Sequence, residues 1–372
     1  MKLISLISGL LVFSLMLSSC AVEKQKKTTF EEKNAEKIEN NEKKEKETSV
    51  IPKDEQDKNA PVDVYENENL DGEAVSTFAN DPETEQYIKA RLDELLKKWD
   101  PKNVDGEIAK LNNTRSNSHL SDETVQLLLN CITLSEKTGG LLDITMYPLT
   151  RMWGFESEEP KKPEDMLVTL VISKCGMDTI TVSNNMFTLG TYTMLDASAV
   201  TSGYAADLIS AELSEMGCKQ ALISVEDHIR CFGVNSDSAK WSVLLSDPFE
   251  GNTPYATLML EADHSVSTKG SYQHYYEEAG KRYCNIFNPE TGMPVDNDLV
   301  AASVVCSNGM TADAYATACF ILGGEGAKKF YRDHTDFELI LVYKNGDIHI
   351  SEGLANSFKS ADKNKNVTVF NK

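Results

Sequence analysis

A long charged segment near the start of the chain restricts where a hydrophobic core can form. Residues 21–75 consist mainly of Lys, Glu, Asn and Asp and contain few apolar side chains. Such a segment cannot bury enough apolar surface to offset the entropy lost on folding. Mixed charges without an apolar stripe also favour a solvated spacer over a helix. We therefore expect a disordered tether there, followed by a folded region over residues 76–355 that is long enough for a sizeable core.

The segment before the tether has the pattern of an export signal. Lys2 precedes an apolar run that is long enough for a secretory signal and too short for a comfortable membrane span. The run ends at residues 17–20 in Leu-Ser-Ser-Cys, which resembles a bacterial lipobox, where the cysteine thiol takes a diacylglycerol. We therefore expect a lipoprotein signal peptide over residues 1–20, lipidation at Cys20, and an extracytoplasmic protein that its lipid anchors to the bacterial cell membrane.

The net charge and the cysteines exclude several classes of protein. The formal net charge is -21, whereas nucleic-acid binding needs clustered cations against phosphate, so we expect no nucleic-acid partner. The chain has eight cysteines, and the seven other than Cys20 form no Cys-x-x-Cys pair and no cluster with histidine. This unpatterned set predicts neither a disulfide framework nor a zinc site.

The folded region alternates helical and strand patterns. Apolar residues at helical spacing predict amphipathic helices over residues 81–101 and 121–140. Runs rich in β-branched and aromatic residues predict strands or hairpins at residues 178–189, 220–225, 241–248 and 337–351. Because there is no regular βαβ period, the pattern favours an α+β fold with mainly antiparallel sheets. Residues 356–372 are polar, and we expect them to form a loosely attached tail.

A late helix carries a candidate metal site. Asp313 and Thr317 lie four residues apart in the segment 308–327, so their side chains share one face of a helix that Thr311 is expected to cap. A carboxylate and a hydroxyl are hard ligands of the kind that Mg²⁺ accepts, together with water and phosphate oxygens. On local chemistry alone, the same pair is more often an acidic helix start and a packed threonine.

Three further segments contain features that would suit a ligand. In residues 195–209, Asp196 precedes a run of small residues and a Gly-Tyr pair, which permits close approach to the backbone. In residues 138–155, Asp143 follows two glycines and precedes aromatic residues that would either wall a planar ligand or belong to the core. In residues 267–295, an Asn-Pro-x-Thr-Gly turn either serves a ligand or only reverses the chain.

Taken in order, these segments resemble the ApbE family, the FAD:protein FMN transferases. The similarity covers about residues 80 to 350 and is carried by GEIAKLN, GGLLDITMYPLTRMWGF, LDASAVTSGYAAD, KGSYQHYYEEAGKRYCNIFNPETGMPV and TADAYATACFILG. Each motif is weak alone, but their order and spacing make a specific signal. The resemblance implies an ApbE-like fold and an enzyme that moves FMN from FAD to a Thr or Ser hydroxyl, releasing AMP. The implied acceptor is a flavoprotein of an extracytoplasmic electron-transport complex.

The resemblance also implies roles for individual residues. The positions expected to bind FAD are Leu141, Leu142, Asp143, Asp196 and Ser202. The positions expected to hold Mg²⁺ are the carbonyl of Ala199 and the side chains of Asp313 and Thr317. Bound Mg²⁺ would neutralise charge on the pyrophosphate and orient it for displacement. Asn285 occupies the position of a family histidine and is the candidate catalytic residue there.

Several positions depart from the family pattern. The substituted positions are Ser202 for a lysine, Asn285 for a histidine, Asn288 for an aspartate, Glu226 and Asp227 for two glycines, and Lys269 for a serine. An amide cannot accept a proton near neutral pH as imidazole can. Two alternatives therefore stay open: a catalytically impaired flavin-binding lipoprotein of the same fold, and an FAD pyrophosphatase that uses water. In an active enzyme, Lys269 is a candidate to restore the missing charge, and His274 or His264 to restore the missing base.

Overall fold

The structure is a computed structural model that describes residues 68–372, except residues 71–72, 80, 118, 156, 158, 235–239, 250–252 and 363. The expected signal peptide, the lipidation site Cys20 and the tether as far as residue 67 lie outside the described residues. Two strands, β1 (Glu68–Leu70) and β2 (Glu73–Ala79), place the start of the fold slightly before the expected boundary at residue 76. Within the described part of the chain, no helix is long and apolar enough to cross a membrane.

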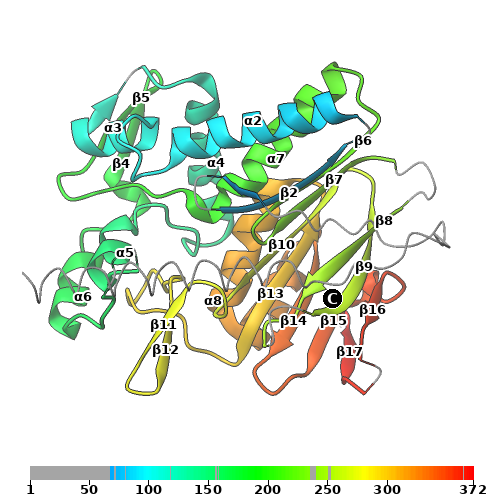
Figure 1. Ribbon diagram of the computed structural model, residues 1–372. Helices are drawn as coiled ribbons and strands as arrows, with labels where there is room; N and C mark the ends of the chain where they lie inside the picture. Colours follow the sequence, from blue (N-terminus) through cyan, green and yellow to red (C-terminus); the bar gives the residue numbers. More distant parts are fainter. Residues whose placement is uncertain are drawn as a thin grey trace, which may run out of the picture. The chain divides into compact units, whose positions relative to one another are not determined.

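A nine-stranded sheet forms the centre of the fold (Figure 1). Its strand order is β1, β2, β6, β7, β10, β13, β14, β15 and β17. The strands not yet bounded are β6 (Gln220–Val225), β7 (His228–Gly233), β10 (His264–Gly270), β13 (Leu299–Cys306), β14 (Glu338–Tyr343), β15 (Ile348–Ser351) and β17 (Val367–Phe370). All neighbouring pairs are antiparallel except β15 and β17. The expected α+β fold with mainly antiparallel sheets is confirmed.

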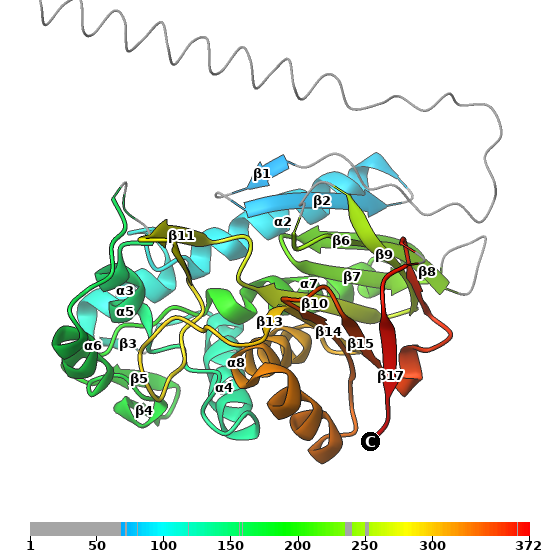
Figure 2. The ribbon, with the colours of Figure 1, turned by 90° about the horizontal axis from the view of Figure 1, so that it is seen from below.

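Both faces of this sheet are buried. One face, which includes Ile223 and Val304, shares a buried core with four helices, α2 (Pro82–Trp99), α4 (Asp122–Lys137), α7 (Ser198–Glu215) and α8 (Gly309–Asp333). Figure 2 shows α4 and α8 along one side of β13 and β14. The other face, which includes Leu222 and Val305, packs against a three-stranded sheet of β8 (Lys240–Ser246), β9 (Pro254–Glu261) and β16 (Phe358–Ser360), to which Trp241 belongs. Successive side chains of a strand point to opposite faces, so burial on both faces explains the nearly continuous apolar runs of β6 and β13.

Helices α2 and α4 form where their sequences predict. Asp81 caps α2, because its Oδ1 accepts a hydrogen bond from the amide of Thr84 at 2.9 Å. Arg91 of α2 ties the helical layer together by pairing with Glu123 of α4 and, at 3.0 Å, with Glu212 of α7. The expected helices near residues 81–101 and 121–140 are therefore confirmed as α2 and α4.

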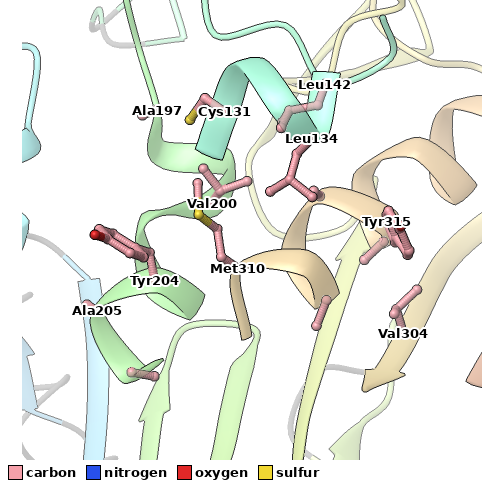
Figure 3. Close-up of a cluster of buried hydrophobic side chains, with 14 of the residues drawn as sticks. Cys131, Leu134, Leu142, Ala197, Val200, Tyr204, Ala205, Val304, Met310 and Tyr315 are labelled. Carbon is pink, nitrogen blue, oxygen red and sulfur yellow. The ribbon is translucent and has the colours of Figure 1, made fainter. Parts of the chain in front are cut away.

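An apolar cluster joins three of these helices (Figure 3). It contains Cys131 and Leu134 of α4, Val200 and Tyr204 of α7, and Met310 of α8, all of which are buried. Because Val200 and Met310 lie in the first turn of their helices, the cluster fixes the starts of α7 and α8 beside each other. These two helices carry the residues that were expected to bind a cation.

Smaller elements complete the described part of the chain. They are α3 (Glu107–Thr114), α5 (Tyr147–Trp153), α6 (Asp165–Ile172), β3 (Ser116–Asn117), β4 (Ile180–Ser183), β5 (Met186–Leu189), β11 (Tyr275–Glu278), β12 (Lys281–Cys284) and two short 3-10 turns, Met177–Thr179 and Glu352–Leu354. Strands β4 and β5 form the hairpin expected at residues 178–189, and β14 and β15 form the hairpin expected at residues 337–351.

Two local expectations were wrong. The cap of α8 is Asn308 and not Thr311, since the Asn308 Oδ1 accepts a hydrogen bond from the amide of Thr311 at 2.8 Å. Residues 356–372 are not loosely attached, because β16 pairs with β9 and β17 pairs in parallel with β15. The polar composition of this segment hid two edge strands, which need few apolar side chains.

Candidate active site

A pocket of about 630 Å³ lies at the meeting point of segments that are far apart in the sequence. Its lining comes from the end of α2 and the loop after it, the loop before α5, the start of α7, the turn between β6 and β7, the end of β10, the β11–β12 hairpin with its flanking loops, and the middle of α8. Four of the five sequence motifs contribute directly. The volume is in the range of pockets that hold a small molecule or cofactor.

Asp196 stands at the turn into α7 and is held on both sides. Its amide donates to the carbonyl of Ile144 at 2.8 Å, and its Oδ1 accepts from the amide of Ser198 at 2.9 Å. The preceding residue, Leu195, is fixed by the side chain of Asn112, which bonds its amide at 2.6 Å and its carbonyl at 2.9 Å. Asn112 belongs to the motif GEIAKLN, which does not line the pocket. Its bonds to Leu195 show how that motif supports the pocket from behind.

The loop before α5 lies beside this turn. The expected FAD-binding residues Leu141, Leu142 and Asp143 all line the pocket, as does Asp196. Asp143 is fixed locally, because its Oδ1 accepts from the amide and the hydroxyl of Thr145 at 2.8 and 2.6 Å. Burial raises the pKa of both Asp143 and Asp196. These carboxylates are therefore positioned by backbone contacts and face a partly desolvated space.

Asp313 lies beneath the pocket wall and does not line it. Its side chain is fully buried, and its Oδ2 accepts a hydrogen bond from the amide of Gly203 at 2.7 Å. Its Oδ1 is 2.9 Å from Nδ1 of His228, whose Nε2 is 3.1 Å from the hydroxyl of Ser265. Burial alone would raise the pKa of Asp313, but His228 and Lys269 outweigh it and hold the pKa below its usual value. His228 is a site residue that the sequence reasoning missed.

The donor set near Asp313 suits a hard cation. Thr317 and Ala199 both line the pocket, and the hydroxyl of Thr317 donates to the carbonyl of Asp313 at 2.9 Å. No group of three or more His, Cys, Asp or Glu side chains in the described residues could hold a metal. A cation here would therefore rely on one carboxylate and neutral oxygens. Mg²⁺ accepts such a set, because it keeps several waters and takes further ligands from phosphate.

Ser202 and His264, two of the residues singled out in the sequence, are not at the pocket. Ser202 is 6% exposed within α7 and is not among the pocket-lining residues. His264 does not line the pocket either, and its Nδ1 lies 3.0 Å from the carbonyl of Ala262. Asn288 is used by its own turn, where its Oδ1 accepts from the amide of Glu290 at 2.8 Å.

Charged side chains gather at the turn between β6 and β7. Glu226, Asp227, Lys269 and His274 all line the pocket there. Oε1 of Glu226 lies 3.5 Å from Nε2 of His274, and Asp227 accepts a hydrogen bond from Gln273. Burial raises the pKa of Asp227 to about 6, although Lys269 opposes this shift. Three positions that depart from the expected family pattern thus meet in one part of the pocket.

Aromatic side chains form another part of the lining. Tyr276 packs on Phe155 with ring centroids 5.3 Å apart, and Phe155 packs on Phe287 at 5.8 Å. All three line the pocket, whereas Trp153 lies behind them and is fully buried. Phe155 and Tyr147 therefore belong to the ligand-facing wall, and Trp153 belongs to the core. Such a wall suits a planar ring system.

The model of the ApbE family matches residues 62–341, which is most of the chain. The chain belongs to the ApbE family. Among its relatives in this family is the FAD:protein FMN transferase of Escherichia coli K12, which is 28% identical over 300 residues, covering 75% of this chain and 84% of that protein. The FAD:protein FMN transferase of Vibrio cholerae is 26% identical over 277 residues, covering 73% and 82%. The protein is therefore a transferase of the ApbE family.

Solved ApbE structures share the fold. The ApbE protein of Thermotoga maritima has a TM-score of 0.71 and 22% sequence identity, over 77% of this chain and 96% of that one. The flavin transferase ApbE of Vibrio cholerae has a TM-score of 0.67 and 22% identity, over 78% and 97%. The expected ApbE-like fold is confirmed.

Proposed function

We propose that this protein is a Mg²⁺-dependent FAD:protein FMN transferase that moves FMN from FAD to a Thr or Ser hydroxyl of an acceptor flavoprotein and releases AMP. The observation that carries the proposal is the pocket, in which the Asp196 turn, the aromatic wall and Thr317 of α8 lie together. A dinucleotide needs both a surface for rings and a place for its pyrophosphate. We expect the rings to pack on the aromatic wall and the pyrophosphate to lie at the Asp196 turn, both of which line this pocket.

The charge of the pocket supports a role for a divalent cation. The carboxylates in its lining are those of Asp100, Asp143, Asp196, Glu226 and Asp227, and the lysines are Lys102 and Lys269. A dianionic pyrophosphate would be repelled by this excess of carboxylates. Asp313, Thr317 and the Ala199 carbonyl would hold Mg²⁺, which when bound neutralises pyrophosphate charge. Asp196 and the backbone at the start of α7 would orient the substrate.

The proposed location and acceptor rest on the sequence. A lipid on Cys20 and the charged segment over residues 21–75 would tether the enzyme to the outer face of the bacterial cell membrane. Its acceptor would then be a flavoprotein of an extracytoplasmic electron-transport complex.

The test uses the chain from residue 21 with Cys20 absent, so that no lipid is attached. The protein is incubated with FAD, Mg²⁺ and an acceptor domain with an exposed threonine, and mass spectrometry and chromatography detect FMN on the acceptor and free AMP. FMN on the acceptor with equimolar AMP is the expected result. Free FMN and AMP would indicate an FAD pyrophosphatase, and intact FAD would favour the catalytically impaired flavin-binding alternative. Asp313→Ala is the matched control, in which we expect no transfer.

A further inference from the structure

The β11–β12 hairpin places a histidine at the pocket. Tyr275 of β11 pairs with Cys284 of β12, and at the next position the amide of Asn285 donates to the carbonyl of His274 at 3.0 Å. His274 and Asn285 are therefore opposite each other at the end of the hairpin, and both line the pocket. The side chain of His274 is 57% exposed, so a second protein can reach it.

Glu226 approaches this histidine from the turn between β6 and β7. Its Oε1 lies 3.5 Å from Nε2 of His274, and its own side chain is 30% exposed. The backbone of Glu226 has a φ of 48°, in the left-handed region that residues other than glycine rarely adopt. Such strain is kept where the surrounding structure holds it, often at functional sites. The turn thus presents a carboxylate to an imidazole across the pocket lining.

Several other ionisable groups of the pocket are less suited to take a proton from an incoming hydroxyl. Asp143 and Asp196 accept hydrogen bonds from nearby backbone amides, and Asp227 accepts one from Gln273. The ammonium groups of lysines such as Lys102 and Lys269 are hydrogen-bond donors without a lone pair. Among the described residues that line the pocket, His274 is the single imidazole.

We propose that His274 is the general base of the transfer reaction and that Glu226 positions its ring. A carboxylate only accepts hydrogen bonds, so Nε2 of His274 carries a proton toward Glu226 and Nδ1 keeps its lone pair. The inference rests on the proposed function. The acceptor hydroxyl oxygen bonds to the FMN phosphorus, and the bond from that phosphorus to the bridging oxygen breaks. AMP leaves with the bridging oxygen and its electron pair, while the hydroxyl proton passes to Nδ1 and then to solvent.

The electrostatics around His274 agree with this role. The pKa of His274 is raised, chiefly by the hydrogen bond to Glu226 and also by the charge of Asp227. Burial and Lys269 lower it, but less strongly. Burial favours a higher pKa for Glu226, but His274 outweighs it, so the pKa of Glu226 is lowered and its carboxylate stays ionised. An ionised Glu226 can accept the hydrogen bond from Nε2 that its positioning role requires.

The experiment compares His274→Gln with His264→Gln in the chain from residue 21, using FAD, Mg²⁺ and an acceptor domain. We expect His274→Gln to lower kcat by about 10²–10⁴-fold without changing the Kd of FAD, measured by flavin fluorescence. His264 lies outside the pocket, so His264→Gln should keep the wild-type kcat. In Glu226→Gln, the pKa of His274 falls, so the rise of kcat with pH should move to lower pH. Asn285→His in the His274→Gln background should restore part of the rate, because the two positions are opposite each other.

The outcomes separate this inference from the proposed function. Transfer by the wild-type chain together with an unchanged kcat in His274→Gln would overturn the role of His274 and leave the transferase standing. Absence of transfer in the wild-type chain would overturn both. Since His274 is exposed, its substitution should leave the fold intact, and unchanged FAD binding verifies this. An unchanged pH profile in Glu226→Gln would contradict the positioning role of Glu226.

Discussion

Nδ1 of His228 lies 2.9 Å from Oδ1 of Asp313, and both side chains are almost completely buried. Because an ionised carboxylate only accepts, the proton of this contact belongs to Nδ1, and Nε2 lies 3.1 Å from the hydroxyl of Ser265. With the amide of Gly203 on its other oxygen, Asp313 is held in one orientation and still has lone pairs for a cation. His228 thus fixes a proposed ligand without facing the pocket itself.

Removing this support should weaken cation binding. Outer partners of metal ligands typically contribute about 10–100-fold to metal affinity, so we expect His228→Ala to raise the Mg²⁺ concentration needed for FAD binding by that factor. The measurement is flavin fluorescence at a series of Mg²⁺ concentrations. His264→Gln is the matched control and should leave the Mg²⁺ dependence unchanged. Equal Mg²⁺ dependence in His228→Ala and wild type would contradict the role given to His228.

Gly203→Ala should damage both stability and the site. A methyl group at Gly203 would collide with the carbonyl of Gly309 and would come within 2.7 Å of Oδ2 of Asp313. The helices α7 and α8 would have to separate, which costs roughly 1–3 kcal/mol. Denaturant unfolding should show this loss, and Mg²⁺-dependent FAD binding should weaken with it. Ser214→Ala, at an exposed position of the same helix, should change stability by less than about 0.5 kcal/mol.

The stability of the protein should depend on pH through Asp227. Its pKa is about 6 in the folded protein against a usual value of 3.8, because burial disfavours the charged form. The unfolded chain therefore ionises first, and stability falls as pH rises from about 4 to about 6, by at most about 3 kcal/mol. Asp227→Asn removes this titration. In denaturant unfolding, the variant's free energy of unfolding should match that of wild type near about pH 4 and exceed it near about pH 7.5. Equal values for variant and wild type at both pH values would contradict the prediction.

Removal of residues 356–372 should destabilise the whole fold. The truncation deletes β16 and β17, and it removes the contact between Phe370 and Tyr331, whose ring centroids are 5.5 Å apart. It also leaves an edge of β15 unpaired, which promotes aggregation. We expect Tm to fall by several degrees and aggregates to appear in size-exclusion chromatography. Deletion of residues 371–372 alone, which follow β17, should have little effect, and equal Tm values for the two truncations would refute the expectation.

The sequence was a good guide wherever the periodicity was long or the turn chemistry was specific. Helix α2, with its Asp81 cap, and the β4–β5 hairpin, whose turn uses Asn184 and Asn185 at positive φ, follow from local rules. The edge strand β16 was missed, because it pairs with β9, which lies far away in the sequence.

The candidate site was partly readable from the sequence. The motifs gave Asp196, Asp143 and Thr317, which the structure brings to one pocket. His228 could not be found that way, since a lone histidine in a strand is usually a packed core residue. Only the register of β7 against β10 and the crossing of α8 bring it to Asp313.

The contact between Gly203 and Asp313 joins residues that are 110 positions apart in the chain. During synthesis, the turn that begins α7 leaves the ribosome long before α8 exists, and at that stage it lacks two of the three oxygens proposed to bind the cation. Closing so long a loop is one of the later and slower events of folding. The proposed cation site is thus complete only once α7 and α8 have docked, so metal would be bound by a chain whose helices already lie together.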